Sequence, residues 1–261
     1  MKRMFRFLNA GVFAVALILG SASLQAQIIF SDDFSSGNDS SWTRLSGYVG
    51  STGQSWFVGG GTNPPNAYRL IAPNNGLSGY GFVGSYAGPS IADGRVEVDF
   101  INFAGPGANP VFAVAGRLNG NNAALSLTGY GYAYEPFASG LTGEMVLYRI
   151  EAGNLIQDIG SQQISLDPAK DYKFVLEFSG STIHGQVFEI GGGLVVERFA
   201  TDTFYAGGYS GVLGYGQNGV TPPVDFTVDN FVVVPEPGVS LLVGLGLVGL
   251  VAIHRFRRKN S

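Results

Sequence analysis

Short runs in which apolar and polar residues alternate constrain this chain more than any other feature of its sequence. Alternation with a period of two is typical of a strand that buries one face, and Gly, Asn-Gly or Asp-Pro turn signals bound each run. The clearest runs are residues 95–100, 145–150, 172–178, 182–190 and 224–233. Away from the two ends, no apolar repeat of period 3.6 is long enough for a helix. The pattern predicts an all-β fold, an antiparallel β-sandwich closed by hairpins.

Composition excludes several classes of chemistry and of partner. The 261 residues include 40 Gly and no Cys, which rules out thiol nucleophiles, zinc–thiolate clusters and disulfides. Residues 27–234 carry 18 acidic and 8 basic side chains, a net charge of −10 that repels nucleic acid phosphates. No second shift in composition divides this stretch. We therefore expect one β-sandwich domain over residues 27–234 and no nucleic acid partner.

Residues 1–26 have the three-part layout of a secretory signal peptide. Basic residues precede an apolar run, and small and polar residues follow it up to Ala26. Cleavage after Ala26 fits this layout. Cleavage after Ser23 is the alternative, because Leu24 is larger than the residue preferred three positions before a cleavage site at Ala26. An uncleaved anchor is disfavoured, since the apolar run is shorter than the ~20 residues of a span. The layout predicts Sec-type export and a signal peptidase as partners.

The C-terminal segment, residues 235–261, carries a second address. It begins with Pro235, Glu236 and Pro237, and an apolar stretch follows that predicts a transmembrane helix over residues 238–254. Sixteen apolar residues at ~1.5 Å rise make ~24 Å of helix, which spans a ~30 Å hydrocarbon core only if flanking side chains snorkel. The basic tail, residues 255–261, contains Arg255, Arg257, Arg258 and Lys259. Because flanking basic residues stay in the cytoplasm, the body is expected across the inner membrane.

This arrangement resembles the PEP-CTERM sorting signal of bacterial envelope and exopolysaccharide systems, in which Pro-Glu-Pro, one transmembrane helix and an Arg-rich tail follow in this order. The resemblance implies an exosortase, a membrane transpeptidase, that cuts near Pro235 to Pro237 and releases or transfers the body. It also implies an inner-membrane intermediate, then the envelope or extracellular matrix of a Gram-negative-type bacterium. A plain tail anchor is the alternative. Because both prolines lack a backbone N–H and resist helix and sheet, we expect an extended, open segment here.

Other stretches resemble the concanavalin A-like jelly rolls, in particular the laminin-G and keto-glycoside-hydrolase-like group. They are residues 32–37 with Trp42, residues 172–178 with 183–187, and residues 211–215 with 228–231. The resemblance spans nearly all of residues 30–234 and implies a jelly roll of a kind often attached to secreted bacterial proteins. It does not fix a function, because one fold of this kind carries many.

Oxygen-rich residues lie at both ends of the predicted domain. Asp32 and Asp33 begin it, and Asp229 and Asn230 end it. If the first and last strands are neighbours, these oxygens come together and suit Ca²⁺, which takes 6 to 8 oxygen ligands. A structural Ca²⁺ is the one cofactor that we consider. The alternative is that the four residues cap strand ends and turns, since no calcium-loop spacing is present.

Three tyrosines alternate with small residues on one predicted strand. Tyr130, Tyr132 and Tyr134 share one face, and Trp56 lies in another Gly-rich stretch. Aromatic rings with polar tips can stack on sugars and bond their hydroxyls, so the row suggests glycan contact, with an exopolysaccharide as partner. The alternative is that the rings fill the core opposite small residues.

No complete catalytic constellation is visible. Glu97 and Asp99 share a strand face, which suggests a glycosidase, yet Ile101 and Asn102 stand where the laminarinase-like jelly rolls have their second Glu. His184 lacks a nearby acid and a Gly-x-Ser-x-Gly elbow, and is expected to be a strand or turn histidine. We therefore predict an exported structural or adhesive protein that contacts polysaccharide and is not an enzyme. The alternative is a secreted glycoside-active enzyme of the jelly-roll type.

Overall fold

The computed structural model describes residues 27–45, 55–58, 66–72, 81–103, 110–120, 126–136, 142–151, 154–216 and 224–236. The predicted signal peptide (1–26), Pro237, the predicted transmembrane helix (238–254) and the basic tail lie outside these residues. None of the described segments is a helix long and apolar enough to cross a membrane. Residues Ile28–Pro235 form one compact unit.

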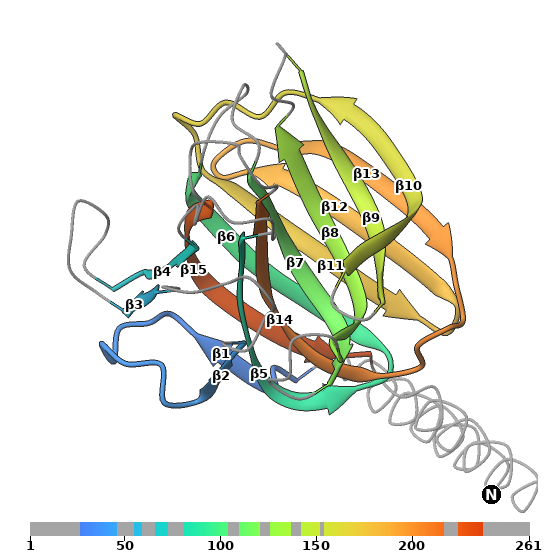
Figure 1. The fold of residues 1–261 in the computed structure, drawn as a ribbon, viewed down its shortest axis with the longest axis horizontal. Helices are drawn as coiled ribbons and strands as arrows, with labels where there is room; N and C mark the ends of the chain where they lie inside the picture. The colour runs from blue at the N-terminus through green and yellow to red at the C-terminus, as the bar shows by residue number, and fades with distance from the viewer. Residues whose placement is uncertain are drawn as a thin grey trace, which may run out of the picture. The chain divides into compact units, whose positions relative to one another are not determined.

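The unit is a two-layer antiparallel β-sandwich, which confirms the predicted all-β fold (Figure 1). The eight-stranded sheet runs in the order β13 (Leu194–Thr201), β12 (Thr182–Glu189), β11 (Tyr172–Ser179), β6 (Gly94–Phe103), β15 (Val224–Pro235), β4 (Tyr68–Ala72) and β3 (Ser55–Val58), with β1 (Phe30–Asp32) paired to β15. The seven-stranded sheet runs in the order β10 (Asn154–Ile164), β9 (Gly143–Glu151), β8 (Thr128–Pro136), β7 (Pro110–Asn119), β14 (Gly208–Gly216), β5 (Gly81–Ile91) and β2 (Trp42–Arg44).

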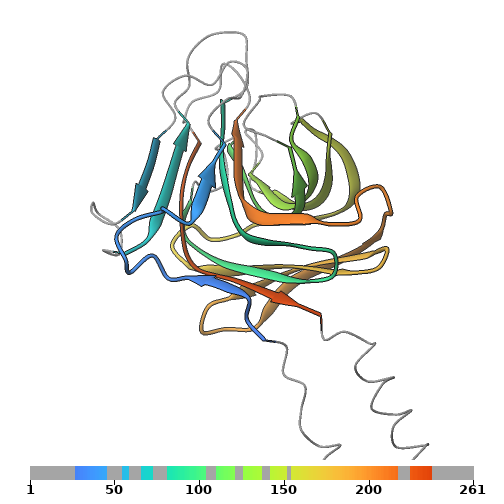
Figure 2. The same ribbon diagram turned by 90° about the horizontal axis from the view of Figure 1, so that it is seen from below.

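The long last strand, β15, brings the start and the end of the domain together. It pairs with β6 along its length, with β4 through its first half and with β1 through its second half. Phe30 of β1 lies opposite Val233, so β1 begins beside the end of β15 (Figure 2). Pro235 is the last residue of β15 and lies opposite Gly94. The expectation that Pro235 lies outside the sheet is therefore wrong, because the final residue of a strand can join it without donating to its ladder.

Aromatic rings fill the space between the sheets, and glycines make room for them. Phe100, Phe112, Phe174 and Phe226 are all buried and contact one another at centroid distances between 4.5 and 6.1 Å. Gly185 of β12 faces the ring of Tyr132, and a Cβ at Gly185 would lie 2.6 Å from that ring. The glycine content thus serves the packing of the core as well as the turns.

Candidate functional site

The central strands of the seven-stranded sheet, β7 and β8, are apolar on nearly all of both faces, which is unusual for an antiparallel sheet. Every residue of β7 except Asn119 is buried, and in β8 only the first residue, Thr128, and Glu135 are not. Because successive side chains of a strand point to opposite faces, every second residue lies on the side away from the eight-stranded sheet. We call this side the outer face. It is formed by Phe82, Tyr86, Val111, Ala113, Ala115, Ala133, Glu135, Glu144, Val146, Tyr148, Ile150, Asp158, Tyr209, Leu213 and Tyr215.

Aromatic side chains lie along the outer face. Tyr86 of β5 and Tyr209 at the start of β14 contact each other with ring centroids 5.0 Å apart and planes 31° apart. Tyr209 is 39% exposed, and Tyr86 is half-buried. Phe82 and Tyr215 lie farther along the same two strands. Exposed tyrosine rings of this kind offer an apolar surface and a hydroxyl to the same ligand.

Carboxyl groups gather at the β8–β10 side of the outer face. Glu135 and Glu144 lie directly opposite each other on adjacent strands, and Asp158 lies opposite Tyr148. The hydroxyl of Tyr148 donates a hydrogen bond to Glu135. Burial is the main cause that raises the pKa of Glu135 above 4.5; Glu144 and Asp158 raise it further, and the Tyr148 hydrogen bond opposes them. Burial and the Glu135 carboxyl also raise the pKa of Tyr148.

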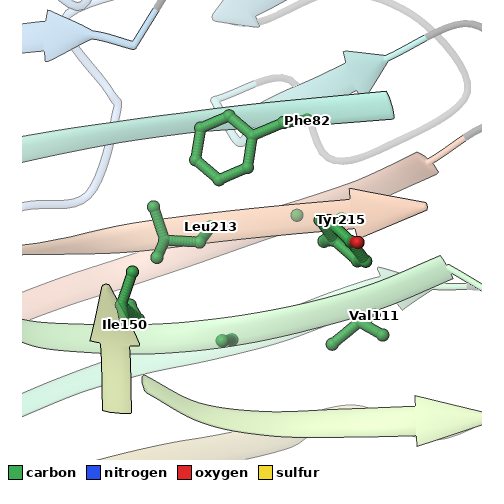
Figure 3. A pocket seen from close by; sticks show the side chains of 7 residues that line it. Phe82, Val111, Ile150, Leu213 and Tyr215 are labelled. Carbon is green, nitrogen blue, oxygen red and sulfur yellow. The ribbon is translucent and has the colours of Figure 1, made fainter. Parts of the chain in front are cut away.

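Between the aromatic and acidic parts, the outer face is closed by apolar side chains. Figure 3 shows Phe82, Leu213 and Tyr215 meeting Val111 and Ile150 around a small pocket. Ile150 lies over Gly131, where an added Cβ would be 3.8 Å from its Cδ1 atom, an ordinary contact. The cavity measures about 10 Å³, which is about the space of one water molecule. The cavity therefore has no room for a sugar ring.

The tyrosine row of β8 belongs to the core, so the predicted glycan contact of these three rings is wrong. Tyr130, Tyr132 and Tyr134 are 0% exposed and point toward the eight-stranded sheet, opposite the small residues that the sequence showed. Tyr130 donates a 2.8 Å hydrogen bond to Asp202, and burial raises the pKa of Tyr130 to about 12. The period of two was right, but it does not say which side of a strand faces solvent.

Trp56, the fourth residue predicted to contact glycan, contacts other parts of the protein instead. Its ring packs against the core from β3, and its indole N–H donates a 3.2 Å hydrogen bond to the carbonyl of Gly84. The guanidinium of Arg44 lies 5.5 Å from the centroid of the ring. These contacts leave Trp56 outside the outer face.

The four residues proposed for Ca²⁺ are brought close together, as expected from neighbouring first and last strands. The carboxyl of Asp32 accepts hydrogen bonds from the N–H of Phe34 at 2.8 Å and from the indole of Trp42 at 2.8 Å. Burial raises the pKa of Asp229, with Asp99, Asp33 and Asp32 adding to the rise against a hydrogen bond from the N–H of Asn230. No group of three acidic or histidine side chains suited to a metal occurs among the described residues. Carboxyl oxygens of Asp32, Asp33 and Asp229 accept hydrogen bonds from nearby backbone N–H groups, as the alternative named above expects, and the Ca²⁺ site stays a prediction.

Glu97, Asp99 and His184 lie on the opposite, outward side of the eight-stranded sheet. Glu97 and Asp99 do share a face, and both approach the ammonium of Lys173, at 3.5 and 3.0 Å. The two ring nitrogens of His184 contact Glu177 at 3.2 Å and Glu197 at 3.0 Å, and its ring stacks on Phe199. Glu97 and Asp99 thus pair with Lys173 on the neighbouring strand, and His184 contacts carboxyl groups of the strands on either side of it.

Comparison with known proteins identifies the C-terminal segment. Residues 233–258 match the family model described as the PEP-CTERM protein-sorting motif. The chain carries a PEP-CTERM sorting signal. Proteins with the PEP-CTERM motif are exported and sorted to the cell surface, and the motif implies processing by an exosortase. No curated protein sequence matches the chain.

The body of this PEP-CTERM protein is a jelly-roll sandwich that resembles concanavalin A-like lectins and glucanases. A laminarinase from Flavobacterium sp. UMI-01 aligns with a TM-score of 0.52 and 14% identity over 80% of this chain and 100% of that chain. Basic winged bean lectin aligns with a TM-score of 0.52 and 8% identity over 78% and 96%. A Bacillus licheniformis β-glucanase gives 0.50 and 13% over 82% and 100%. At these identities the likeness shows the fold alone.

Sequence reasoning missed the outer face, although one signal was present. The predicted strands were those with clear alternation, whereas β5, β7 and β14 are apolar on both sides and show little of it. In strand β8 the alternating tyrosines are the clear sequence pattern, and Glu135 on the other face of the strand was not considered. A carboxylate within a nearly all-apolar strand is the signal that could have located this face.

Proposed function

We propose that this protein is exported, held at the inner membrane by its tail, processed by an exosortase, and delivered to the envelope or extracellular matrix of a Gram-negative-type bacterium. There its sandwich acts as a structural or adhesive module that binds polysaccharide across the outer face. The matched sorting motif supports the route. The contact between half-buried Tyr86 and exposed Tyr209 on the outer face is the observation that carries the binding proposal.

The route is tested by the intact mass of the mature protein from the host's envelope and medium, with the sorting enzyme present and deleted. We expect a chain that ends near Pro235 to Pro237 only when the enzyme is present. A chain that keeps Arg255 to Lys259 in both strains would make the C-terminus a simple anchor.

The binding proposal is tested with a Tyr86→Ala/Tyr209→Ala double variant and the host's own exopolysaccharide in affinity electrophoresis. Loss of two stacking rings should weaken binding about tenfold or more, the factor that corresponds to about 1.4 kcal/mol. Phe57→Ala removes an aromatic ring that is 48% exposed on β3, in the other sheet, and should leave binding unchanged. Equal binding by wild type and double variant, at equal melting temperature, would remove the outer face from consideration.

The acidic part of the outer face supports a second candidate, a glycoside-active enzyme. Directly opposed strand residues have Cβ atoms ~4.5–5.5 Å apart, which allows the rotamers of two Glu side chains to reach the ~5–5.5 Å carboxyl separation that retaining glycosidases use. Glu135, whose pKa is raised, is suited to the acid role, and Glu144 to the nucleophile. Wild type should then release reducing ends from a panel of β-glucans, and Glu135→Gln and Glu144→Gln should each abolish the release. A wild-type protein without such activity would exclude the enzyme.

A further inference from the structure

The folded body reaches the sorting motif without a linker. Val232 and Val233 of β15 pair with β1 on one side and with β6 on the other, and Pro235 pairs with Gly94. Peptides are often bound in an extended form through their backbone N–H and C=O groups. Because Val232 and Val233 are paired on both sides, and Val234 and Pro235 are paired with β6, such a site can reach a free side of the backbone only after Val233.

The chain between the sandwich and the apolar run is too short for an enzyme to cut it without contacting the sandwich. Glu236 and Pro237 are the two residues between β15 and the apolar run that begins at Gly238. From Pro235 to Gly238, three residue steps of fully extended chain reach about 11 Å at most. An enzyme that cuts within this stretch must bring its catalytic groups within that distance of Pro235, and so its surface meets the sandwich.

The part of the sandwich that it meets is apolar and exposed. Ile28 and Ile29 are 55% and 38% exposed, and the N–H of Ile29 donates a 3.0 Å hydrogen bond to the carbonyl of Val233. Gly94 packs so closely on the end of β15 that a Cβ at this position would lie 2.9 Å from the Cα of Pro235. We call Ile28, Ile29 and Pro235 the end surface; Gly94 is buried beneath it. Exposed apolar side chains at a place where a partner must come close are typical of a docking site.

We propose that the sorting enzyme, a membrane transpeptidase, binds the end surface of the folded sandwich in addition to the C-terminal segment. Ile28 and Ile29 are the apolar anchors of this contact. The proposal rests on processing by such an enzyme, which is part of the proposed function. It makes the body itself, and not the tail alone, a determinant of how fast the protein is sorted.

The test follows processing of the full-length chain in its host by pulse-chase and intact mass. One variant, Ile28→Ser/Ile29→Ser, removes the apolar anchors. A second inserts six Gly and Ser residues between Val234 and Pro235, so that Pro-Glu-Pro stays intact but moves away from the sandwich. The matched control, Ile190→Ser/Leu194→Ser, changes two apolar residues that are 44% and 49% exposed, one in the turn after β12 and one at the start of β13.

We expect both test variants to be processed about tenfold more slowly than wild type, with the control unchanged, since a lost apolar contact of this size corresponds to that factor. A slowing of less than about threefold in the two test variants would overturn the proposal. The intact mass also shows whether the signal peptide has been removed. If the isoleucine changes disturb that removal, the insertion variant, which leaves Ile28 and Ile29 unchanged, still tests the proposal. Contact with lipid instead would appear as enzyme-independent membrane retention that the isoleucine changes abolish while processing stays normal, and this too overturns the proposal. If wild type is cut in neither strain, the proposed sorting route itself fails.

Discussion

At the scale of single residues, Arg117 is the most unusual side chain of the body. Its side chain is 2% exposed in β7, at a bulge that also gives it a positive φ of 49°. Bulges re-aim side chains, and this one sends a guanidinium inward. There it donates hydrogen bonds to the carbonyls of Ala92, Tyr205 and Gly180 and to the carboxyl of Asp93, and it lies 4.7 Å from the ring centroid of Phe178. One buried cation therefore connects three turns.

Arg117→Ala should lower the free energy of unfolding by about 3 kcal/mol or more. The change leaves carbonyl groups without donors and opens a cavity beside Phe178. Urea unfolding of the mature protein measures the effect. Lys170→Ala, which breaks an exposed ion pair with Glu189, is the control and should stay close to wild type. Equal stability of the two variants would mean that water replaces the guanidinium.

Glu135 gives the body a pH dependence of known direction. Because burial raises its folded pKa above 4.5, the folded state holds more protons than the unfolded state between 4.5 and the raised value. The free energy of unfolding therefore falls as pH rises through this window. Glu135→Gln lacks this loss, so its stability relative to wild type should increase between about pH 4 and about pH 7.

Asp202→Asn is the control for this experiment. Burial alone would raise the pKa of Asp202, but hydrogen bonds from the N–H of Phe204, the Tyr130 hydroxyl and Arg149 lower it on balance, below 3.8. Its contribution is lost only as pH falls below that value, so the difference from wild type should stay constant over the same range. A constant difference for Glu135→Gln as well would show that Glu135 is solvated.

At the scale of elements, the two sheets fit because rings of one face glycines of the other. Tyr132 of β8 lies against Gly185 of β12, and Phe226 of β15 lies close to Gly214 of β14. The alternation within a strand was predictable from sequence, since it depends on neighbours two residues apart. The partner of each ring was not, because it lies on a strand distant in sequence and its identity depends on register.

Gly185→Ala should destabilise the protein by about 1–3 kcal/mol, because its Cβ would lie 2.6 Å from the Tyr132 ring and the core would be overpacked. Gly193→Ala, in the turn before β13, is the matched control because no atom lies within 4 Å of the added group. Thermal unfolding of both variants measures the effect. If Gly185→Ala melts with the control, the ring moves aside at little cost.

At the scale of the whole molecule, β15 links the fold to its address. The last strand is shared by the sandwich, where Val233 is fully buried, and by the matched sorting motif, which begins at Val233. Residues 233–235 therefore belong both to the folded sandwich and to the sorting motif. A cut within Val232–Pro235 would damage the sandwich, whereas a cut after Glu236 would leave it intact.

Truncation separates these two outcomes. A chain that ends at Glu236 should keep the melting temperature of the processed protein. A chain that ends at Phe231 loses Val233 and two of the three residue pairs between β15 and β1, and should melt about 5–10 °C lower. Calorimetry of the two exported chains checks this. Equal melting temperatures would show that the end of β15 adds nothing to stability.

The sequence by itself determined the all-β class and the C-terminal address. Both are local properties: alternation, turn residues and the order of Pro-Glu-Pro, apolar run and basic tail are read within short windows. Only the tertiary structure decided which face of β8 is buried, that Glu135 and Glu144 oppose each other on the outer face, and that Pro235 is part of a strand. These depend on register and on pairing between strands such as β6 and β15, whose residues lie more than a hundred positions apart. Side chains brought together over such distances leave no pattern in a single sequence.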